Sequence, residues 1–231
     1  MNQRISFLVL LFLVIFAVVQ SDQNQPTEPP GKGGAKNDDA AEADKALETY
    51  QKLFLQKRAQ HVQAVEEMLD SYDYQKQFQM VELIRDRVVQ VFSEARKLLS
   101  ESSFEPGMPL PSDEATRSMM SVVLENVAFV GDIVLRLPDI SHKVFDKNKN
   151  FMDELRWGMD FAERTDFLDD IHKQLFHLMA QEMEFIPKEP SYHNPYRKKE
   201  KQFQEKKSEP KKKKKKEKPK KKGPRMSKVE L

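Results

Sequence analysis

Apolar residues recur at helical spacing through a long segment without proline or glycine, from Ala40 to Glu101. In its second half the intervals alternate between three and four residues, which is typical of one face of an amphipathic helix. These positions are Val81, Ile84, Val88, Val91, Ala95 and Leu98. The first half is less regular: its apolar positions are Leu47, Tyr50, Phe54, Ala64 and Met68, with gaps near Lys57 and His61.

Polar residues at 70–74, with the sequence DSYDY, separate the two halves. Asp and Ser side chains compete for backbone hydrogen bonds and so favour a break in a helix. The pattern predicts two antiparallel helices joined by a tight turn, and one long bent helix is the alternative.

A proline-rich connector follows and leads into the most apolar of the expected bundle helices, which ends near Leu137. Ser112 is expected to cap this third helix, with acidic residues after it favouring the positive helix end. Because the stretch is apolar around most of its circumference, it is expected in the middle of a bundle. Asn126 on the buried side then requires a hydrogen-bond partner. Gly131, which weakens a helix relative to alanine, is expected where another helix crosses closely.

The remaining apolar segments are shorter. A short helix is expected over 139–147, and residues 151–161 carry the single tryptophan. A last amphipathic helix is predicted from Asp166 to Glu184, before Pro187, with inner positions Phe167, Ile171, Leu175, Leu178 and Met179. No stretch alternates like a strand. The sequence therefore predicts an all-α protein, a bundle of five or six helices over residues 41–186, large enough to fold without disulfides.

The N-terminus predicts secretion. Arg4 precedes an almost wholly apolar run from Ile5 to Val19, and small residues at Val19 and Ser21 fit a cleavage site. Residues 1–21 are therefore interpreted as a cleaved signal peptide; an uncleaved anchor is the alternative, although the run is short for a membrane span. No later stretch is expected to span a bilayer. Residues 22–40 are polar and rich in proline and glycine, and are expected to be a disordered lead-in.

Charge divides the chain into an acidic body and a basic tail. Residues 22–196 hold 20 Lys and Arg against 32 Asp and Glu, a net of −12, whereas residues 197–228 hold 18 against 4, a net of +14. The segment 187–231 is expected to be disordered, as a solvated arm, a ligand for an acidic protein, or a polyanion-binding tail. Nucleic acid is the least favoured partner, because Phe203 is the only aromatic residue among residues 197–228 and base stacking is poorly supplied.

Residue types that carry catalysis are not arranged in any motif. The chain has no cysteine, so disulfide exchange and cysteine nucleophiles are excluded. The five histidines form no H-E-x-x-H pair. Asp146, Asn148 and Asn150 resemble the start of a calcium loop, but Phe151 and Trp157 stand where glycine and glutamate are required. We therefore expect that the protein is not an enzyme and that it binds no metal and no cofactor.

Several blocks resemble the coiled-coil domain-containing protein 134 family, in the same order from about residue 44 to the end. They are VVLENVAFVGDIVLRLP (122–138), RWGMDF (156–161), LMAQE (178–182), Asn194-Pro195 and GPRMS (223–227). The resemblance implies a small helical protein retained in the endoplasmic reticulum. It also implies binding to the nascent luminal Hsp90 chaperone, endoplasmin, which limits its excess N-glycosylation, and damping of mitogen-activated kinase signalling. Where relatives carry a glycosylation sequon after the RWG block, this chain has Glu163-Arg164-Thr165.

The last four residues, Lys228, Val229, Glu230 and Leu231, are similar to a Lys-Asp-Glu-Leu retrieval signal. We therefore expect a non-enzymatic luminal binding protein, with endoplasmin and a retrieval receptor as partners. A secreted regulator of kinase signalling is the alternative, and a nuclear protein would require the signal peptide to fail. The candidate partner surface comprises Arg156, Trp157, Lys211, Lys212, Lys213, Lys214, Lys215 and Lys216.

Overall fold

The computed structural model describes residues 37–197, and within that range it consists of six helices and no strand. The helices are α2 (Asn37–Ser71), α3 (Tyr74–Glu101), α4 (Glu114–Arg136), α5 (Pro138–Phe145), α6 (Lys149–Glu163) and α7 (Asp170–Glu182). The expected all-α class is confirmed. The predicted signal peptide, most of the lead-in and the tail from residue 198 lie outside the described residues.

The expected break at 70–74 separates α2 from α3, so the single bent helix is excluded. Asp73 caps α3, its carboxylate accepting a hydrogen bond from the backbone N–H of Lys76 at 3.0 Å. The Gln77 side chain donates to the carbonyls of Tyr72 at 2.9 Å and Leu69 at 3.2 Å, which satisfies the end of α2. The side chains of Asp73 in the turn and Gln77 in α3 thus fix the turn.

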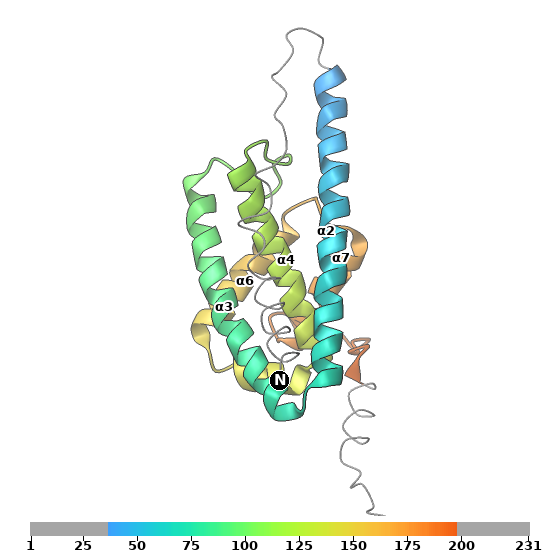
Figure 1. Ribbon diagram of the computed structural model, residues 1–231, viewed down its shortest axis with the longest axis vertical. Coiled ribbons are helices and arrows are strands. Elements are labelled where there is room, and N and C mark those ends of the chain that lie inside the picture. Colours follow the sequence, from blue (N-terminus) through green and yellow to red (C-terminus); the bar gives the residue numbers. More distant parts are fainter. Residues whose placement is uncertain (1–36, 198–231) are drawn as a thin grey trace, which may run out of the picture.

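Helix α4 is the centre of the molecule and packs against each of the five other described helices. Figure 1 shows α4 between α2 and α3, which run in opposite directions and diverge from their shared turn. These two helices do not pack along their lengths against each other. The helices α2 and α3 are therefore antiparallel as expected, but α4 lies between them and separates them.

The whole of α4 from Val122 to Arg136 is buried, as its apolar circumference predicts. Its cap differs from the prediction: Asp113, not Ser112, accepts hydrogen bonds from the Thr116 N–H at 2.8 Å and hydroxyl at 2.6 Å. A carboxylate at the cap also complements the helix dipole. By length and composition α4 could cross a membrane, contrary to our expectation, but 83% of its most apolar window is buried in the bundle. A core helix meets the same criterion.

Two small or polar positions on the central helices behave as expected. Asn126 is buried, and its amide donates to the carbonyl of Val122, one turn back, at 2.8 Å. A Cβ atom on Gly131 would lie 3.2 Å from Cγ of Leu175, so α7 does cross α4 closely there. Gly158 of α6 is tighter still, because a Cβ would lie 2.8 Å from the ring of Phe92.

Two apolar positions that we expected inside are exposed. Leu98 is 48% exposed, and Leu99 is buried in its place. Leu99 follows Val81 by 18 residues, which is five turns at 3.6 residues per turn, so a stripe counted in threes and fours drifts off the face. Ile171 is 74% exposed, because α7 begins only at Asp170 and turns His172 inward instead.

Candidate functional site

The two candidate residues on α6 have separate surroundings. The Trp157 ring is half-buried between Phe92 and Phe161, at centroid distances of 6.2 and 5.7 Å, and the Arg96 guanidinium lies 5.3 Å above it. Arg156 is exposed and lies 4.5 Å above the ring of Phe185, beyond α7. Successive helical residues point about 100° apart, which explains why neighbours in sequence do not share one contact surface.

Of these two positions, Trp157 lies among residue types that are common in protein-binding surfaces. Tryptophan and arginine are enriched among residues that dominate binding energy, and here Arg96 of α3 and Trp157 of α6 meet at the surface of the bundle. Glu154 adds an ion pair to Arg96 at 3.8 Å, which holds the guanidinium near the ring. The lysine run 211–216 and the Lys228–Leu231 terminus lie outside the described residues.

A buried charge cluster, which sequence reasoning missed, fills the gap near Lys57 and His61. Asp132 of α4 accepts a hydrogen bond from Arg58 of α2 at 2.6 Å through one oxygen. Its other oxygen accepts from Arg136, one turn along α4, also at 2.6 Å. All three side chains are buried, and we call this group the arginine bridge. It joins α2 to α4 by charge where apolar packing is interrupted.

Neighbouring titratable groups in the α2–α4 contact are strongly perturbed. Burial, together with the charges of Arg58 and Lys57, lowers the pKa of His61 to about 3. Burial raises the pKa of Glu125 to about 7, although Lys57 and Arg58 act in the opposite direction. The His61 ring packs 4.9 Å from Phe129, and its Nδ1 finds no hydrogen-bond partner in the described part of the chain. Both groups are therefore neutral over part of the range in which they are ordinarily charged.

A second buried carboxylate, Glu182 at the end of α7, holds the residues that follow the last helix. It accepts hydrogen bonds from the Tyr192 hydroxyl and from the Asn194 amide, the latter at 3.2 Å. Arg197 pairs with its other oxygen at 3.3 Å. Burial raises the pKa of Glu182, but these hydrogen bonds and the Arg197 charge outweigh burial and hold the pKa below its ordinary value.

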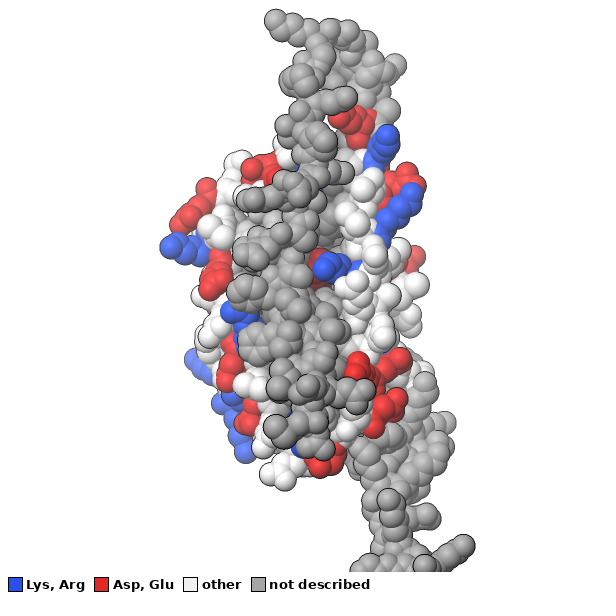
Figure 2. All heavy atoms as spheres, viewed as in Figure 1, with Lys and Arg blue, Asp and Glu red and all other residues white. Residues whose placement is uncertain are grey.

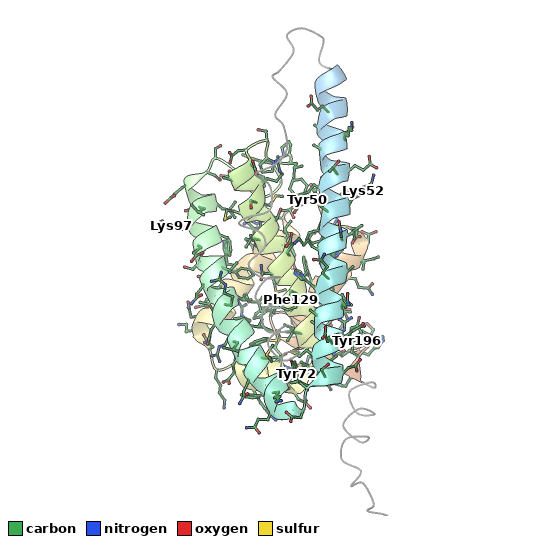
Figure 3. All side chains as sticks on the ribbon, viewed as in Figure 1. Tyr50, Lys52, Tyr72, Lys97, Phe129 and Tyr196 are labelled. Atoms are coloured by element: carbon green, nitrogen blue, oxygen red, sulfur yellow. The ribbon has the colours of Figure 1, made fainter. Side chains whose placement is uncertain are left out.

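Residues 187–197, which we call the C-terminal strap, therefore return to the bundle rather than leaving it at Ile186. The strap ends at α4, where the Arg136 guanidinium lies 4.2 Å above the Tyr196 ring. In the view of Figure 3, Tyr196 and Tyr72 lie toward the same end of the bundle. The signal that could have located both carboxylates was the presence of Asp132 and Glu182 inside otherwise apolar helical stretches, where a charge requires partners.

On the face shown in Figure 2, acidic and basic side chains are interspersed over α2 and α3. The described residues contain no group of three or more His, Asp or Glu side chains that could hold a metal ion. The molecule is thus an all-α bundle around one buried helix, with charge clusters that join elements to each other.

Comparison with known proteins then places it: the chain belongs to the coiled-coil domain-containing protein 134 family. A family model described as "ERK and JNK pathways, inhibitor" matches residues 35–227. A Xenopus tropicalis protein named coiled-coil domain-containing protein 134 is 35% identical over 161 residues, 69% of this chain and 70% of that protein. Its Mus musculus namesake is 33% identical over the same shares. These are descriptions of coiled-coil and inhibitor proteins rather than of enzymes. No solved structure matches.

Proposed function

We propose that this protein is a non-enzymatic binding protein of the endoplasmic reticulum lumen that engages nascent endoplasmin and limits its excess N-glycosylation. The observation that carries the proposal is family membership across residues 35–227, because the resemblance to this family implies that role. The N-terminal signal and the Lys228–Leu231 terminus support the location. The sequence contains no catalytic motif, and this supports a role in binding another protein rather than in catalysis.

The described surface best suited to a protein partner is the contact between Arg96 and Trp157. An aromatic ring that is half-buried loses little side-chain entropy on binding, and it offers apolar area and a stacked cation. We assign the partner contact to this surface, and the basic tail supplies a second, electrostatic contact to an acidic partner.

The test is crosslinking in the lumen of cells that express the full chain, followed by purification and identification of partners. Endoplasmin is expected in the crosslinked material. In cells that lack the protein, endoplasmin should migrate as heavier glycoforms, which digestion of N-glycans collapses to one band. Unchanged glycosylation in those cells would refute the proposed role.

The surface is tested separately from the function. Trp157→Ala should lower endoplasmin recovery, whereas Lys173→Glu, at an exposed position on α7, should leave it unchanged. Trp157→Phe retains most of the packing against Phe92 and controls for loss of fold. Equal recovery with all three variants would place the contact elsewhere while leaving the function standing.

The description of the family model favours a second candidate function, a secreted regulator that damps mitogen-activated kinase signalling. Val229 replaces the aspartate of the usual retrieval signal, which favours partial escape from retention. Deletion of residues 228–231 should raise secretion if these residues retain the protein. Medium containing the secreted chain should then lower ERK and JNK phosphorylation in recipient cells, and no such decrease is expected if the protein acts only in the lumen.

A further inference from the structure

The two buried carboxylates belong to one continuous path of contacts that begins in the C-terminal strap. Glu182 anchors Asn194 through its amide at 3.2 Å. The side-chain oxygen of Asn194 in turn accepts a hydrogen bond from the backbone N–H of Tyr196 at 2.9 Å. These bonds fix the position of the Tyr196 ring relative to α7.

The path continues from the strap into the central helix. Arg136 stacks over the Tyr196 ring at 4.2 Å and donates to Asp132 at 2.6 Å. The ring covers the guanidinium of Arg136, whose side chain is only 6% exposed, so it excludes water from the arginine bridge. Exclusion of water strengthens the attraction between the carboxylate and both arginines, because ion pairs are weaker in a high dielectric.

The path ends in α2, which packs against α4. Asp132 binds Arg58 at 2.6 Å, and α4 is the described helix against which α2 packs extensively. Two further donor atoms of Arg58, Nε and Nη1, are buried without a partner among residues 37–197. The ionic contact between α4 and this part of α2 therefore depends on a single carboxylate, Asp132, and the strap covers one of its two partners.

We propose that the C-terminal strap and α2 are energetically coupled through Glu182, Asn194, Tyr196 and the arginine bridge, so that release of either element loosens the other. The strap leads directly into the basic tail, and α2 carries the first described residues of the chain. The network thus connects the two ends of the bundle. Coupling of this kind is reciprocal, so a partner that pulls on the tail weakens α2, and a partner bound to α2 shifts the strap by the same factor.

Hydrogen–deuterium exchange on the full chain tests the coupling. Tyr196→Ala removes the ring over Arg136 and should speed exchange both in the strap and in the α2 segment around Arg58. The expected effect in α2 is at least about twofold, the lower end for residues that share one network. Strap exchange that rises while α2 exchange stays at the wild-type rate would overturn the proposal.

A matched control changes the strap without touching the network. Glu189→Ala removes the exposed contact between Glu189 and His177, at 3.0 Å, and should speed exchange in the strap alone. If this variant loosens α2 as much as Tyr196→Ala does, the effect comes from general loosening of the strap and the network is not responsible.

The reciprocal experiment starts from α2. Arg58→Met leaves Asp132 paired with Arg136, so the bundle retains a neutral buried pair. Exchange in the strap should then rise by at least about twofold, the lower end for residues that share one network. Arg58→Lys, which keeps the charge and shortens the reach, should act in the same direction and replaces Arg58→Met if that variant does not fold. Unchanged strap exchange in a folded variant would contradict the coupling.

Discussion

One carboxylate at Asp132 compensates two buried guanidinium groups, and neither arginine can reach water to replace it. We expect Asp132→Asn to lower the free energy of unfolding by about 3–5 kcal/mol, because it leaves two buried cations unpaired. Urea unfolding followed by circular dichroism measures the loss. Asp160→Asn is the matched control: it breaks a pair with Arg164 in which both side chains are more than half exposed, and it should cost less than about 1 kcal/mol.

His61 and Glu125 make opposite contributions to the pH dependence of stability. As the pH falls below 6.5, the unfolded chain protonates His61, whereas the folded chain does so only near pH 3, so stability falls with pH. As the pH rises above 4.5, the unfolded chain ionises Glu125, whereas the folded chain keeps the proton to about pH 7, so stability falls as the pH rises. The two contributions therefore oppose each other between pH 4.5 and 6.5.

Single substitutions should separate these contributions. Relative to wild type, Glu125→Gln should make stability rise more steeply with pH between 4.5 and 6.5, by up to about 1.4 kcal/mol per pH unit. His61→Gln should shift the slope by a similar amount in the opposite direction. Urea unfolding at several pH values checks both, and differences from wild type cancel the other titrating groups. Equal slopes for all three proteins would refute the perturbed pKa values.

At the scale of whole helices, two glycines lie where helices pack closely, and the neighbouring side chains differ in how easily they can move. At Gly158 a Cβ would meet the Phe92 ring at 2.8 Å, and that ring is completely buried, so Gly158→Ala should overpack the contact of α3 with α6. Overpacking costs about 1–3 kcal/mol and exceeds the roughly 1 kcal/mol that alanine adds to helix propensity. Thermal unfolding should show a lower Tm for this variant.

Gly131 provides the comparison within the same bundle. Its nearest neighbour is the half-buried Leu175 side chain at 3.2 Å, which can shift by a few tenths of an ångström. Gly131→Ala should therefore change the Tm little, because the gain in helix propensity offsets the contact. A loss as large as that of Gly158→Ala would show that the contact between α4 and α7 is equally rigid.

The sequence predicted the helices and those positions whose structure depends on residues nearby in the chain. The break at Asp73, the buried Asn126 and the close crossing at Gly131 all follow from local chemistry. Leu98 was placed wrongly because a small error in period accumulates over five turns, and Ile171 because the start of α7 depends on its cap at Asp169. Periodicity determines which face is buried only as accurately as the helix boundaries are known.

The candidate site was less predictable, since it depends on partners far apart in the chain. The gap in the α2 stripe gave no sign that Asp132, 74 residues later, would compensate Arg58. In the same way, prolines at 187 and 190 predicted the end of α7 but not the return of the strap to Glu182. Charge pairs between distant segments leave no periodic trace in a sequence.

At the scale of the whole molecule, the acidic body and the basic tail meet at the strap, and the described bundle extends to Arg197 rather than ending at Ile186. A chain that ends after Arg197 should unfold at the same urea concentration as a chain that continues to Leu231. A chain that ends after Ile186 leaves Glu182 without its partners Tyr192, Asn194 and Arg197 and should lose at least about 1–3 kcal/mol. Glu182→Gln in the shorter chain should recover part of that loss, because it removes the uncompensated charge. Equal stability of the two truncated chains would show that the strap rests on the bundle without stabilising it.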